Sequence, residues 1–210
     1  MRVWECQISD NLTESEGGNA VALYASVAWL RQTDVVDNHG WGVNVFNRSQ
    51  LEVTGGTVSR NGGPGLHVID GSQLRIFETE VADNEAAGIV VRLNSNAWIE
   101  DASIHGNHEE GLSVTEVSSA RVFGTTISAN FENGISTGAH AFMSIVNSNV
   151  RDNGGDGLFL YRDAGAEVVS DTQIPANGSG WAIVCAGKEA SVEIDPEAGI
   201  GPVNCEDPEF

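Results

Sequence analysis

One asparagine recurs along almost the whole chain at a nearly constant interval. Its successive copies are separated by 27, 23, 23, 23, 23, 23 and 24 residues, and they are Asn11, Asn38, Asn61, Asn84, Asn107, Asn130, Asn153 and Asn177. A period of this length is typical of solenoids, in which each repeat forms one coil and stacks on the coil before it. We therefore expect about eight stacked coils rather than an ordinary globular core.

Apolar residues keep fixed positions relative to this asparagine. An aliphatic residue lies three positions before it in every repeat, as Ile8, Val35, Val58, Val81, Ile104, Ile127, Val150 and Ile174. A glycine and then an aliphatic residue follow it by four and five positions, as Gly42-Val43, Gly65-Leu66, Gly88-Ile89, Gly111-Leu112, Gly134-Ile135 and Gly157-Leu158. A third apolar pair comes later in each repeat, for example Leu74 and Ile76. Within these segments apolar and polar residues alternate, which is the period of a β-strand with one buried face.

Three alternating segments in about 23 residues leave no room for a helix. The chain must turn after each segment and return over itself, so that equivalent positions stack ~4.8 Å apart. The sequence therefore predicts an all-β solenoid with three parallel sheets around a narrow apolar interior. Each recurring asparagine is expected to bond to the asparagines one coil above and below, while tolerating left-handed backbone at the strand end. The glycine four positions later is expected to supply a positive φ or a close approach.

The repeat predicts one main domain. Residues 1–195 carry the solenoid, whereas residues 196–210 contain three prolines, lose the alternation and are predicted to form a C-terminal cap or tail. Extra residues near 14–19 predict a protruding loop. Because the chain starts almost directly in a strand, we expect earlier coils and an export signal upstream in a longer secreted protein.

The net charge argues against several classes of partner. The chain has 30 Asp and Glu against 10 Lys and Arg, a net charge of -20, and no basic stripe. Nucleic acids and anionic membranes are repelled by such a surface, and we predict no membrane span. A polyanionic glycan would bind only where local arginines or calcium intervene.

The cysteines leave two alternatives open. Cys185 and Cys205 bracket the last coil and the tail, so a bridge between them would fasten the C-terminal end and leave Cys6 unpaired. Alternatively, all three are buried thiols that fill apolar space. The first alternative agrees with an extracellular or cell-surface location.

The motifs VADNEAAGIVV, IHGNHEEGLSV, ISANFENGIST and VRDNGGDGLFL resemble the right-handed parallel β-helix repeat of the pectate-lyase-like superfamily. The resemblance covers about residues 3 to 194. That superfamily includes pectate and alginate lyases, polygalacturonases, alginate epimerases, phage tailspikes and surface proteins without a known reaction. The resemblance therefore implies a single-stranded right-handed β-helix and favours a polysaccharide ligand, but it does not specify an activity.

Catalytic signatures of the superfamily are missing. Of the polygalacturonase motifs that place two carboxylates around a glycosidic bond, only His39-Gly40 is suggestive, and the single lysine, Lys188, lies far along the chain. The Asp-Pro-His-Glu signature of alginate epimerases is absent. No acidic cluster with a nearby arginine resembles a calcium-dependent pectate lyase. These absences favour a scaffold that binds polysaccharide, a surface glycan or a protein without catalysis.

An unusual catalytic set stays open as the alternative. Stacking of the coils would place His67 diagonal to Arg92, with Asp70 and Glu116 at strand ends of neighbouring coils. A histidine base, an arginine that neutralises a uronate carboxylate and a nearby acid suit β-elimination by a polysaccharide lyase, or hydrolysis. The plainer interpretation is a set of scattered polar residues on a solvated sheet.

A second set is the best candidate for ligand contact. The repeat places Trp98 between Arg75 and Arg121 on an outer face. An indole with arginines on either side can stack on a sugar ring and pair with its carboxylates. The alternative, which we weigh above binding, is that the two arginines shield the indole by cation–π contact.

No metal or cofactor site is predicted. His105, His108 and Glu110 have no spacing that makes them converge, and acidic turns are usually only solvated. Weak calcium binding at turns such as residues 152–156 remains open. The sequence does not define the oligomeric state.

Overall fold

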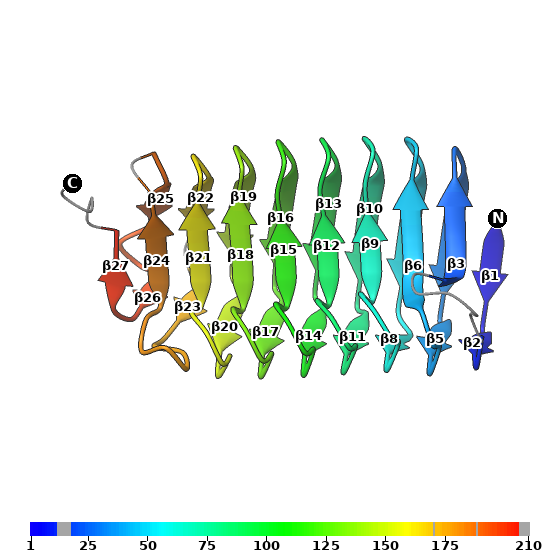
Figure 1. Cartoon of the computed structure of the whole chain (residues 1–210). Coiled ribbons are helices and arrows are strands. Elements are labelled where there is room, and N and C mark those ends of the chain that lie inside the picture. Colours follow the sequence, from blue (N-terminus) through cyan, green and yellow to red (C-terminus); the bar gives the residue numbers. More distant parts are fainter. Residues whose placement is uncertain (12–17, 170, 188, 206–210) are drawn as a thin grey trace.

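The computed structural model describes residues 1–11, 18–169, 171–187 and 189–205, and within them it contains 27 strands and no helix. The strands form three parallel sheets that run the length of a rod (Figure 1). Residues 12–17 lie outside the described residues, and with them most of the protruding loop predicted near residues 14–19; Lys188 also lies outside them. The described part of the chain has no helix that is long and apolar enough to cross a membrane.

Each sheet takes one strand from every coil, in the order that the chain visits them. Sheet A consists of β1 (Arg2–Trp4), β4 (Val27–Arg31), β7 (Gln50–Thr54), β10 (Gln73–Phe77), β13 (Asn96–Glu100), β16 (Ser119–Phe123), β19 (Phe142–Val146), β22 (Gly165–Val168) and β25 (Ser191–Ile194). Sheet B consists of β2 (Gln7–Ser9), β5 (Asp34–Val36), β8 (Thr57–Ser59), β11 (Glu80–Ala82), β14 (Ser103–His105), β17 (Thr126–Ser128), β20 (Asn149–Arg151), β23 (Gln173–Ile174) and β26 (Gly199–Ile200). Sheet C consists of β3 (Asn19–Tyr24), β6 (Trp41–Phe46), β9 (Leu66–Val68), β12 (Ile89–Val91), β15 (Leu112–Val114), β18 (Ile135–Gly138), β21 (Leu158–Tyr161), β24 (Ile183–Ala186) and β27 (Val203–Asn204).

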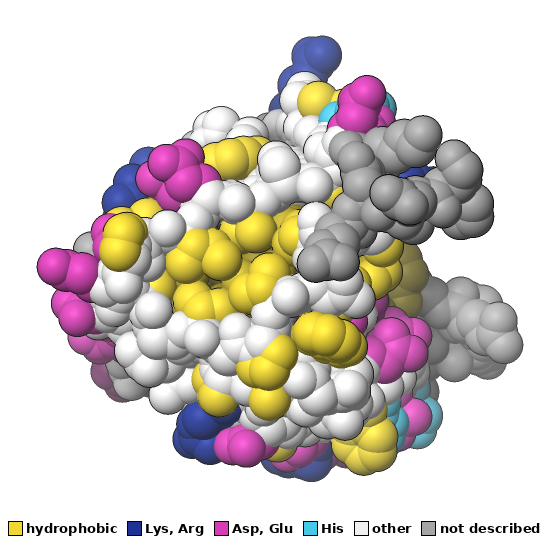
Figure 2. All heavy atoms as spheres, turned by 90° about the vertical axis from the view of Figure 1, so that its left-hand side faces the viewer, with side chains coloured by type: hydrophobic (Ala, Val, Ile, Leu, Met, Phe, Trp, Pro, Cys, Tyr) yellow, Lys and Arg dark blue, Asp and Glu magenta, His cyan; other side chains and the backbone are white. Residues whose placement is uncertain are grey.

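The core is the set of inward positions that the repeat predicts. Equivalent residues pair across neighbouring strands, so Leu74, Ala97 and Ala120 form one buried column of sheet A. The aliphatic residues before and after the recurring asparagine are buried in the same way along sheets B and C. Seen from the C-terminal end, apolar side chains fill the centre of the rod, and polar and charged side chains surround them (Figure 2). The fold is therefore the predicted all-β solenoid.

The recurring asparagines form the predicted ladder. From Asn11 to Asn153, each amide nitrogen donates to the side-chain oxygen of the asparagine in the next coil, over 2.8–3.0 Å, and Asn177 accepts the last of these bonds. The backbone N–H of each asparagine donates to that same oxygen, for example Asn84 to Asn107 Oδ1 at 3.1 Å. Every ladder asparagine after Asn11 is buried. The ladder thus satisfies polar groups at the corner between sheets B and C.

The backbone strain at this corner lies one residue earlier than predicted. The residue with positive φ is the one before the asparagine, such as Asp83 at 53° and Asp152 at 56°. None of the ladder asparagines is among the residues with positive φ. The glycine four positions later makes a close approach instead, because a Cβ on Gly111 would lie 2.7 Å from Asn130 Nδ2.

Two further ladders, which were not predicted from the sequence, stabilise the other corners. Between sheets C and A, the backbone N–H groups of Ser26, Ser49, Ser72 and Ser95 each donate to the hydroxyl of the serine in the next coil, at 3.0–3.1 Å. Between sheets A and B, Ala102 N–H donates to Thr125 Oγ1 at 3.3 Å, and Thr125 N–H donates to Ser148 Oγ at 3.2 Å. Serine and threonine hydroxyls therefore accept hydrogen bonds from the preceding coil at these two corners, as asparagine side chains do at the corner between sheets B and C.

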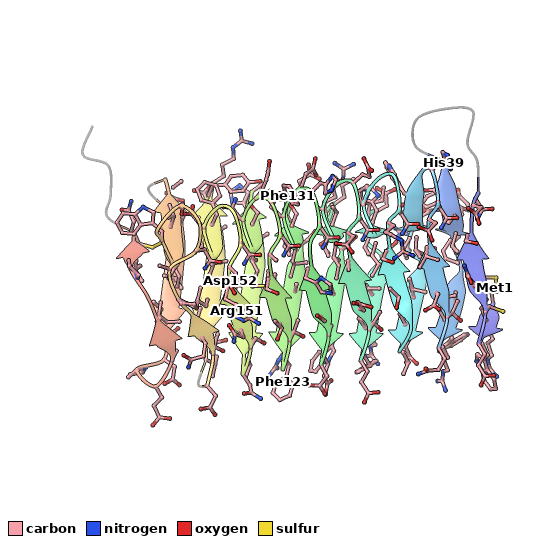
Figure 3. All side chains as sticks on the ribbon, turned by 90° about the horizontal axis from the view of Figure 1, so that it is seen from below. Met1, His39, Phe123, Phe131, Arg151 and Asp152 are labelled. Atoms are coloured by element: carbon pink, nitrogen blue, oxygen red, sulfur yellow. A yellow bond between two sulfur atoms is a disulfide. The ribbon has the colours of Figure 1, made fainter. Side chains whose placement is uncertain are left out.

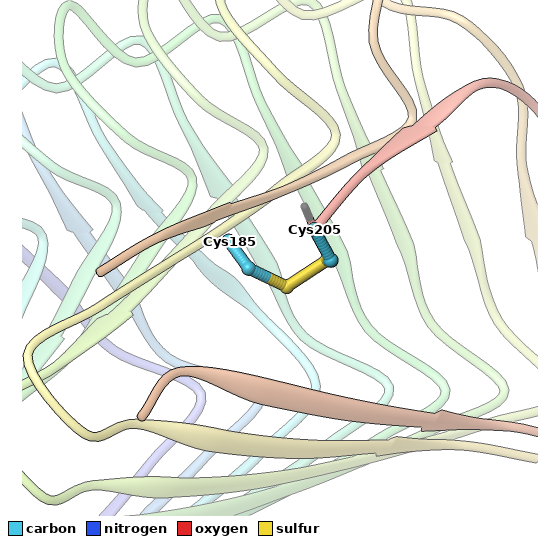
Figure 4. Close-up of a disulfide and its surroundings, with 2 residues drawn as sticks. All are labelled: Cys185 and Cys205. Carbon is cyan, nitrogen blue, oxygen red and sulfur yellow. A yellow bond between two sulfur atoms is a disulfide. The ribbon is translucent and has the colours of Figure 1, made fainter. Parts of the chain in front are cut away.

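Residues 196–205, in the segment predicted to form a C-terminal cap or tail, contain two further short strands. β26 pairs with β23, and β27 pairs with β24, so residues 199–204 complete a further coil although their side chains do not alternate regularly. Strand pairing uses backbone groups, so it does not require the apolar pattern. A disulfide between Cys185 and Cys205 fastens this coil to β24 (Figure 4). Cys6 is exposed and free.

Candidate functional site

The outer face of sheet A carries a row of arginines and tryptophans. One outward position from each coil forms this central row, which runs Arg2, Trp29, Glu52, Arg75, Trp98, Arg121, Ser144, Glu167 and Glu193. Alternation along each strand turns these side chains away from the core. The parallel register places them about 4.8 Å apart along the rod.

Trp98 lies between Arg75 and Arg121 in the central row, in the order that the repeat predicts. Among the described residues only Arg121 covers the indole, with its guanidinium carbon 5.2 Å from the ring centroid. The indole N–H donates to Glu100 Oε2 at 2.8 Å, and the residue is 39% exposed. The structure therefore contains the predicted shielding on the Arg121 side, while Arg75 makes no such contact.

Trp29 repeats this arrangement nearer the N-terminus. The guanidinium carbon of Arg2 lies 5.2 Å from the Trp29 ring centroid. Two open hollows adjoin the indole. The glutamine hollow, about 230 Å³, is lined by Val27, Ala28, Trp29, Gln50, Leu51, Glu52, Gln73 and Arg75. The arginine hollow, about 210 Å³, is lined by Arg2, Trp4, Trp29 and Arg31. Trp29 is therefore a wall shared by two adjoining recesses on a flat sheet.

The two ends of the central row differ in charge. Three arginines, Arg2, Arg75 and Arg121, lie before β19, whereas Glu167 and Glu193 are direct neighbours after it. The one carboxylate among the first five positions, Glu52, is paired with Arg31 Nη2 at 3.3 Å. In a chain with a net charge of -20, the N-terminal part of this face is thus a local cationic and aromatic surface.

Trp29 was not among the predicted ligand-binding residues, although the sequence contains a signal for it. Trp29 stands 23 residues before Glu52, which is one repeat. Arg2 stands 27 residues before Trp29, because the extra residues in the first coil lengthen that interval. A row extended backwards by one period would have found the indole.

His67 and Arg92, the predicted catalytic pair, lie on neighbouring coils of sheet C. His67 is only 3% exposed, its Nδ1 lies 3.1 Å from Asn44 Oδ1, and the Trp41 ring packs on its imidazole with centroids 4.6 Å apart. Burial, and secondarily the positive charge of Arg92, lower the pKa of His67 to about 4. The histidine is therefore neutral at neutral pH and covered by an aromatic ring.

Asp70 and Glu116, the acids predicted to join this pair, occupy equivalent turns two coils apart. Asp70 follows β9 and Glu116 follows β15, both with positive φ, and both are exposed. Their carbonyl oxygens accept hydrogen bonds from the backbone N–H groups of Arg48 and Asn94, each one coil earlier. The structure brings His67 and Arg92 together and leaves the two carboxylates in the solvated turns.

The side chains considered for a metal site have separate partners. His105 Nε2 lies 3.0 Å from Glu80 Oε1, whereas His108 packs on Phe131 at 4.9 Å. Glu110 bonds to Ser136, and burial is the main reason that its pKa is raised. Among the described residues no group of three or more His, Cys, Asp or Glu is placed to hold a metal ion.

The edge along the asparagine ladder and the outer face of sheet B consist of turns and short strands. His39 and Phe131, which follow ladder asparagines, lie along one edge of the rod (Figure 3). Arg151 and Asp152 form an ion pair at the end of β20, on sheet B. Neither surface combines an aromatic side chain with arginines as sheet A does, so we take the N-terminal part of the central row as the candidate site.

Solved structures with the same fold come from enzymes that act on polysaccharides. A double mutant of the periplasmic alginate epimerase AlgG superimposes with a TM-score of 0.70, at 15% identity over 84% of this chain and 50% of that one. Pectate lyase Pel9A has a TM-score of 0.68, at 9% identity over 94% of this chain and 68% of that one. The A-module of the mannuronan C-5 epimerase AlgE4 from Azotobacter vinelandii has a TM-score of 0.58, at 13% identity over 88% and 63%.

At these identities the similarity concerns the fold, and this chain spans about half the length of the AlgG epimerase. Comparison with curated protein sequences gives no match. The model of the right-handed β-helix region, by contrast, matches residues 3–113 and 41–194, which together cover nearly the whole chain. The chain therefore belongs to the right-handed parallel β-helix family.

Proposed function

We propose that this protein binds an acidic polysaccharide along the outer face of sheet A, without itself modifying it. The observation that carries the proposal is the cationic and aromatic surface around Trp29 on an otherwise strongly acidic chain. Two hollows adjoin that indole, and arginines line both. Indole faces stack on sugar rings, and guanidinium groups pair with carboxylates.

The comparisons support the ligand class. The similar structures are alginate, mannuronan and pectate enzymes by name, so this fold is used on polymers of acidic sugars. A chain of sugars laid along the rod would pass Trp29, Arg75 and Trp98 in succession. We also infer an extracellular or periplasmic location, because a disulfide such as Cys185–Cys205 persists in oxidising surroundings.

Binding calorimetry with pectate, alginate and unsulfated glycosaminoglycan fragments tests this function. We expect at least one fragment to bind, and Trp29→Ala to weaken that binding by about tenfold, the loss expected for an aromatic anchor. Arg75→Gln should weaken it severalfold. Arg151→Gln is the matched control, because Arg151 is a similarly exposed, paired arginine on sheet B. Absence of binding, or equal losses in the control, would overturn the proposal.

A polysaccharide lyase centred on His67 and Arg92 is the second candidate. Its supporting observation is the neutral imidazole of His67, with a pKa of about 4, beside an arginine whose Nε is buried without a hydrogen-bond partner among the described residues. Strongly shifted pKa values are common at catalytic sites. Catalysis there requires Trp41 to move off His67, because the imidazole is buried beneath that ring.

A lyase assay separates the two candidates. Double-bond absorbance is followed on the same polysaccharides, with and without calcium. Product formation that is abolished by His67→Ala or Arg92→Ala would establish the lyase. Binding without turnover agrees with the non-catalytic function.

A further inference from the structure

The two hollows beside Trp29 have different linings. Among the described residues, the arginine hollow is lined by two guanidinium groups, from Arg2 and Arg31, and two indoles, without a carboxylate. The glutamine hollow contains one guanidinium group, from Arg75, one carboxylate, from Glu52, and the amides of Gln50 and Gln73. Counted by their lining residues alone, the first recess has a formal charge of +2 and the second is neutral, and the Glu52 carboxylate of the second bonds to Arg31 of the first.

These linings suit different sugars. Paired arginines with aromatic walls favour a sugar that carries a carboxylate, because guanidinium groups bond to it while the ring stacks. Side-chain amides both donate and accept hydrogen bonds, so Gln50 and Gln73 match the hydroxyl groups of an uncharged sugar. A carboxylate placed in the glutamine hollow would meet Glu52 as well as Arg75, whereas in the arginine hollow it would meet arginines alone.

Glu52 sits at the boundary between the hollows. It follows Trp29 in the central row, and its carboxylate bonds to Arg31, which lines the other hollow. The pair is half-exposed, with 50% of the Arg31 side chain and 28% of the Glu52 side chain accessible. Removing the charge of Glu52 would make the glutamine hollow cationic and would free Arg31 at the same time.

We propose that the hollows are adjoining subsites of opposite preference, so that the preferred ligand is a glycan in which carboxylated and uncharged sugars alternate. The arginine hollow takes the carboxylated sugar, the glutamine hollow takes the uncharged one, and Trp29 separates them. Glu52 is then the residue that discriminates against a polymer with a carboxylate on every sugar. This inference rests on the proposed binding function of sheet A.

Calorimetry with hexasaccharides of equal length tests the preference. Hyaluronan fragments alternate a uronate with an uncharged amide-bearing sugar, oligogalacturonate carries a carboxylate on every residue, and chitin fragments carry none. The wild-type chain is expected to bind the hyaluronan fragment at least about threefold more tightly than the others, a difference on the scale of one exposed charge. Glu52→Gln should remove that advantage by strengthening oligogalacturonate binding.

Two further variants make the test specific. Gln73→Glu adds a second carboxylate to the glutamine hollow and should weaken oligogalacturonate more than hyaluronan. Glu80→Gln is the matched control, because Glu80 is a 48% exposed, paired glutamate on sheet B, and it should change neither affinity.

The outcomes are distinct. Tighter binding of oligogalacturonate by the wild-type chain, or an unchanged affinity ratio in Glu52→Gln, would overturn the alternating preference and leave the proposed function standing. If none of the pectate, alginate and glycosaminoglycan fragments binds, both the alternating preference and the proposed binding function are overturned.

Discussion

At the scale of single residues, some buried side chains depart from the repeat. Thr137 occupies a column of sheet C in which its neighbours are Val114 and Leu160, and the same column holds valines in the preceding coils. The residue is fully buried, and its hydroxyl has no hydrogen-bond partner among the described residues. A buried hydroxyl without a partner destabilises the folded state.

Thr137→Val is therefore expected to raise the free energy of unfolding by about 1 kcal/mol, since valine keeps the shape and removes the hydroxyl. Thr125→Val is the matched control. Its hydroxyl is equally buried but donates to the Phe123 carbonyl and accepts from Ala102 N–H, so that substitution should destabilise. Urea denaturation measures the free energy of unfolding of both variants. Equal changes in the two would contradict the conclusion that the Thr137 hydroxyl is unpaired and the Thr125 hydroxyl is not.

His67 gives a prediction on pH. Its pKa is lowered in the folded chain to about 4 from an ordinary 6.5. The unfolded chain takes up a proton first as pH falls, so the stability that His67 contributes is fully present above pH 6.5 and is lost between about pH 6.5 and 4. In that interval the wild-type chain should lose stability more steeply than His67→Gln. Parallel stability curves from denaturation at several pH values would show the prediction to be wrong.

At the scale of elements, the three corner ladders let such short strands stack. Most strands of sheets B and C have only three residues, so the corners contribute a large share of the hydrogen bonds between coils. The asparagine ladder carries more bonds per residue than the serine ladder. Asn107 accepts two bonds from Asn84 and donates to Asn130, whereas Ser95 Oγ accepts one from the backbone of Ser72.

Asn107→Leu should lower the free energy of unfolding by about 1–3 kcal/mol, because it leaves neighbouring buried amides without partners. Ser95→Ala should have a smaller effect, and Asn11→Leu the smallest of the three, since Asn11 is exposed at the end of the ladder. Thermal and denaturant unfolding of the three variants check this order. A loss for Asn11→Leu as large as that for Asn107→Leu would argue against a cooperative ladder.

At the scale of the whole molecule, the rod is least buried at its ends. The partly buried apolar residues that pack against the core belong to the first and last coils, and they are Val3, Ile8, Ala20, Ala190, Val192, Ile194, Ala198 and Ile200. The disulfide joins residues 20 positions apart at the C-terminal end. It therefore restrains the coil with the fewest packing partners.

Replacing Cys185 and Cys205 together by alanine should destabilise this end by about 3 kcal/mol, the value expected for a loop of this length. Hydrogen exchange should become faster in β24, β26 and β27 and stay unchanged in the central strands, because each coil contacts only its neighbours. Cys6→Ala, at the free cysteine, is the control. Unchanged protection of β27 in the double variant would mean that the disulfide does not hold the coil.

The fold could be predicted from the sequence more fully than the candidate site. The spacing of Asn107 and the alternation around it fix which residues face inward, because every coil must repeat its neighbour. The outer face lacks that constraint. The sequence placed both Arg75 and Arg121 beside Trp98, but only side-chain conformation decides that Arg121 covers the ring. Likewise, His67 was expected on an outer face, and the ring of Trp41 from the preceding coil buries it.

The central claim is that sheet A is the binding face, and oxidative footprinting of the tryptophans tests it most directly. With a bound acidic polysaccharide, we expect Trp4, Trp29 and Trp98 to be protected from oxidation. Tyr24 on sheet C and Trp181 before β24 are also exposed, and their oxidation should not change. Protection of Tyr24 or Trp181, with the sheet A tryptophans still reactive, would contradict the account and place the ligand elsewhere on the rod.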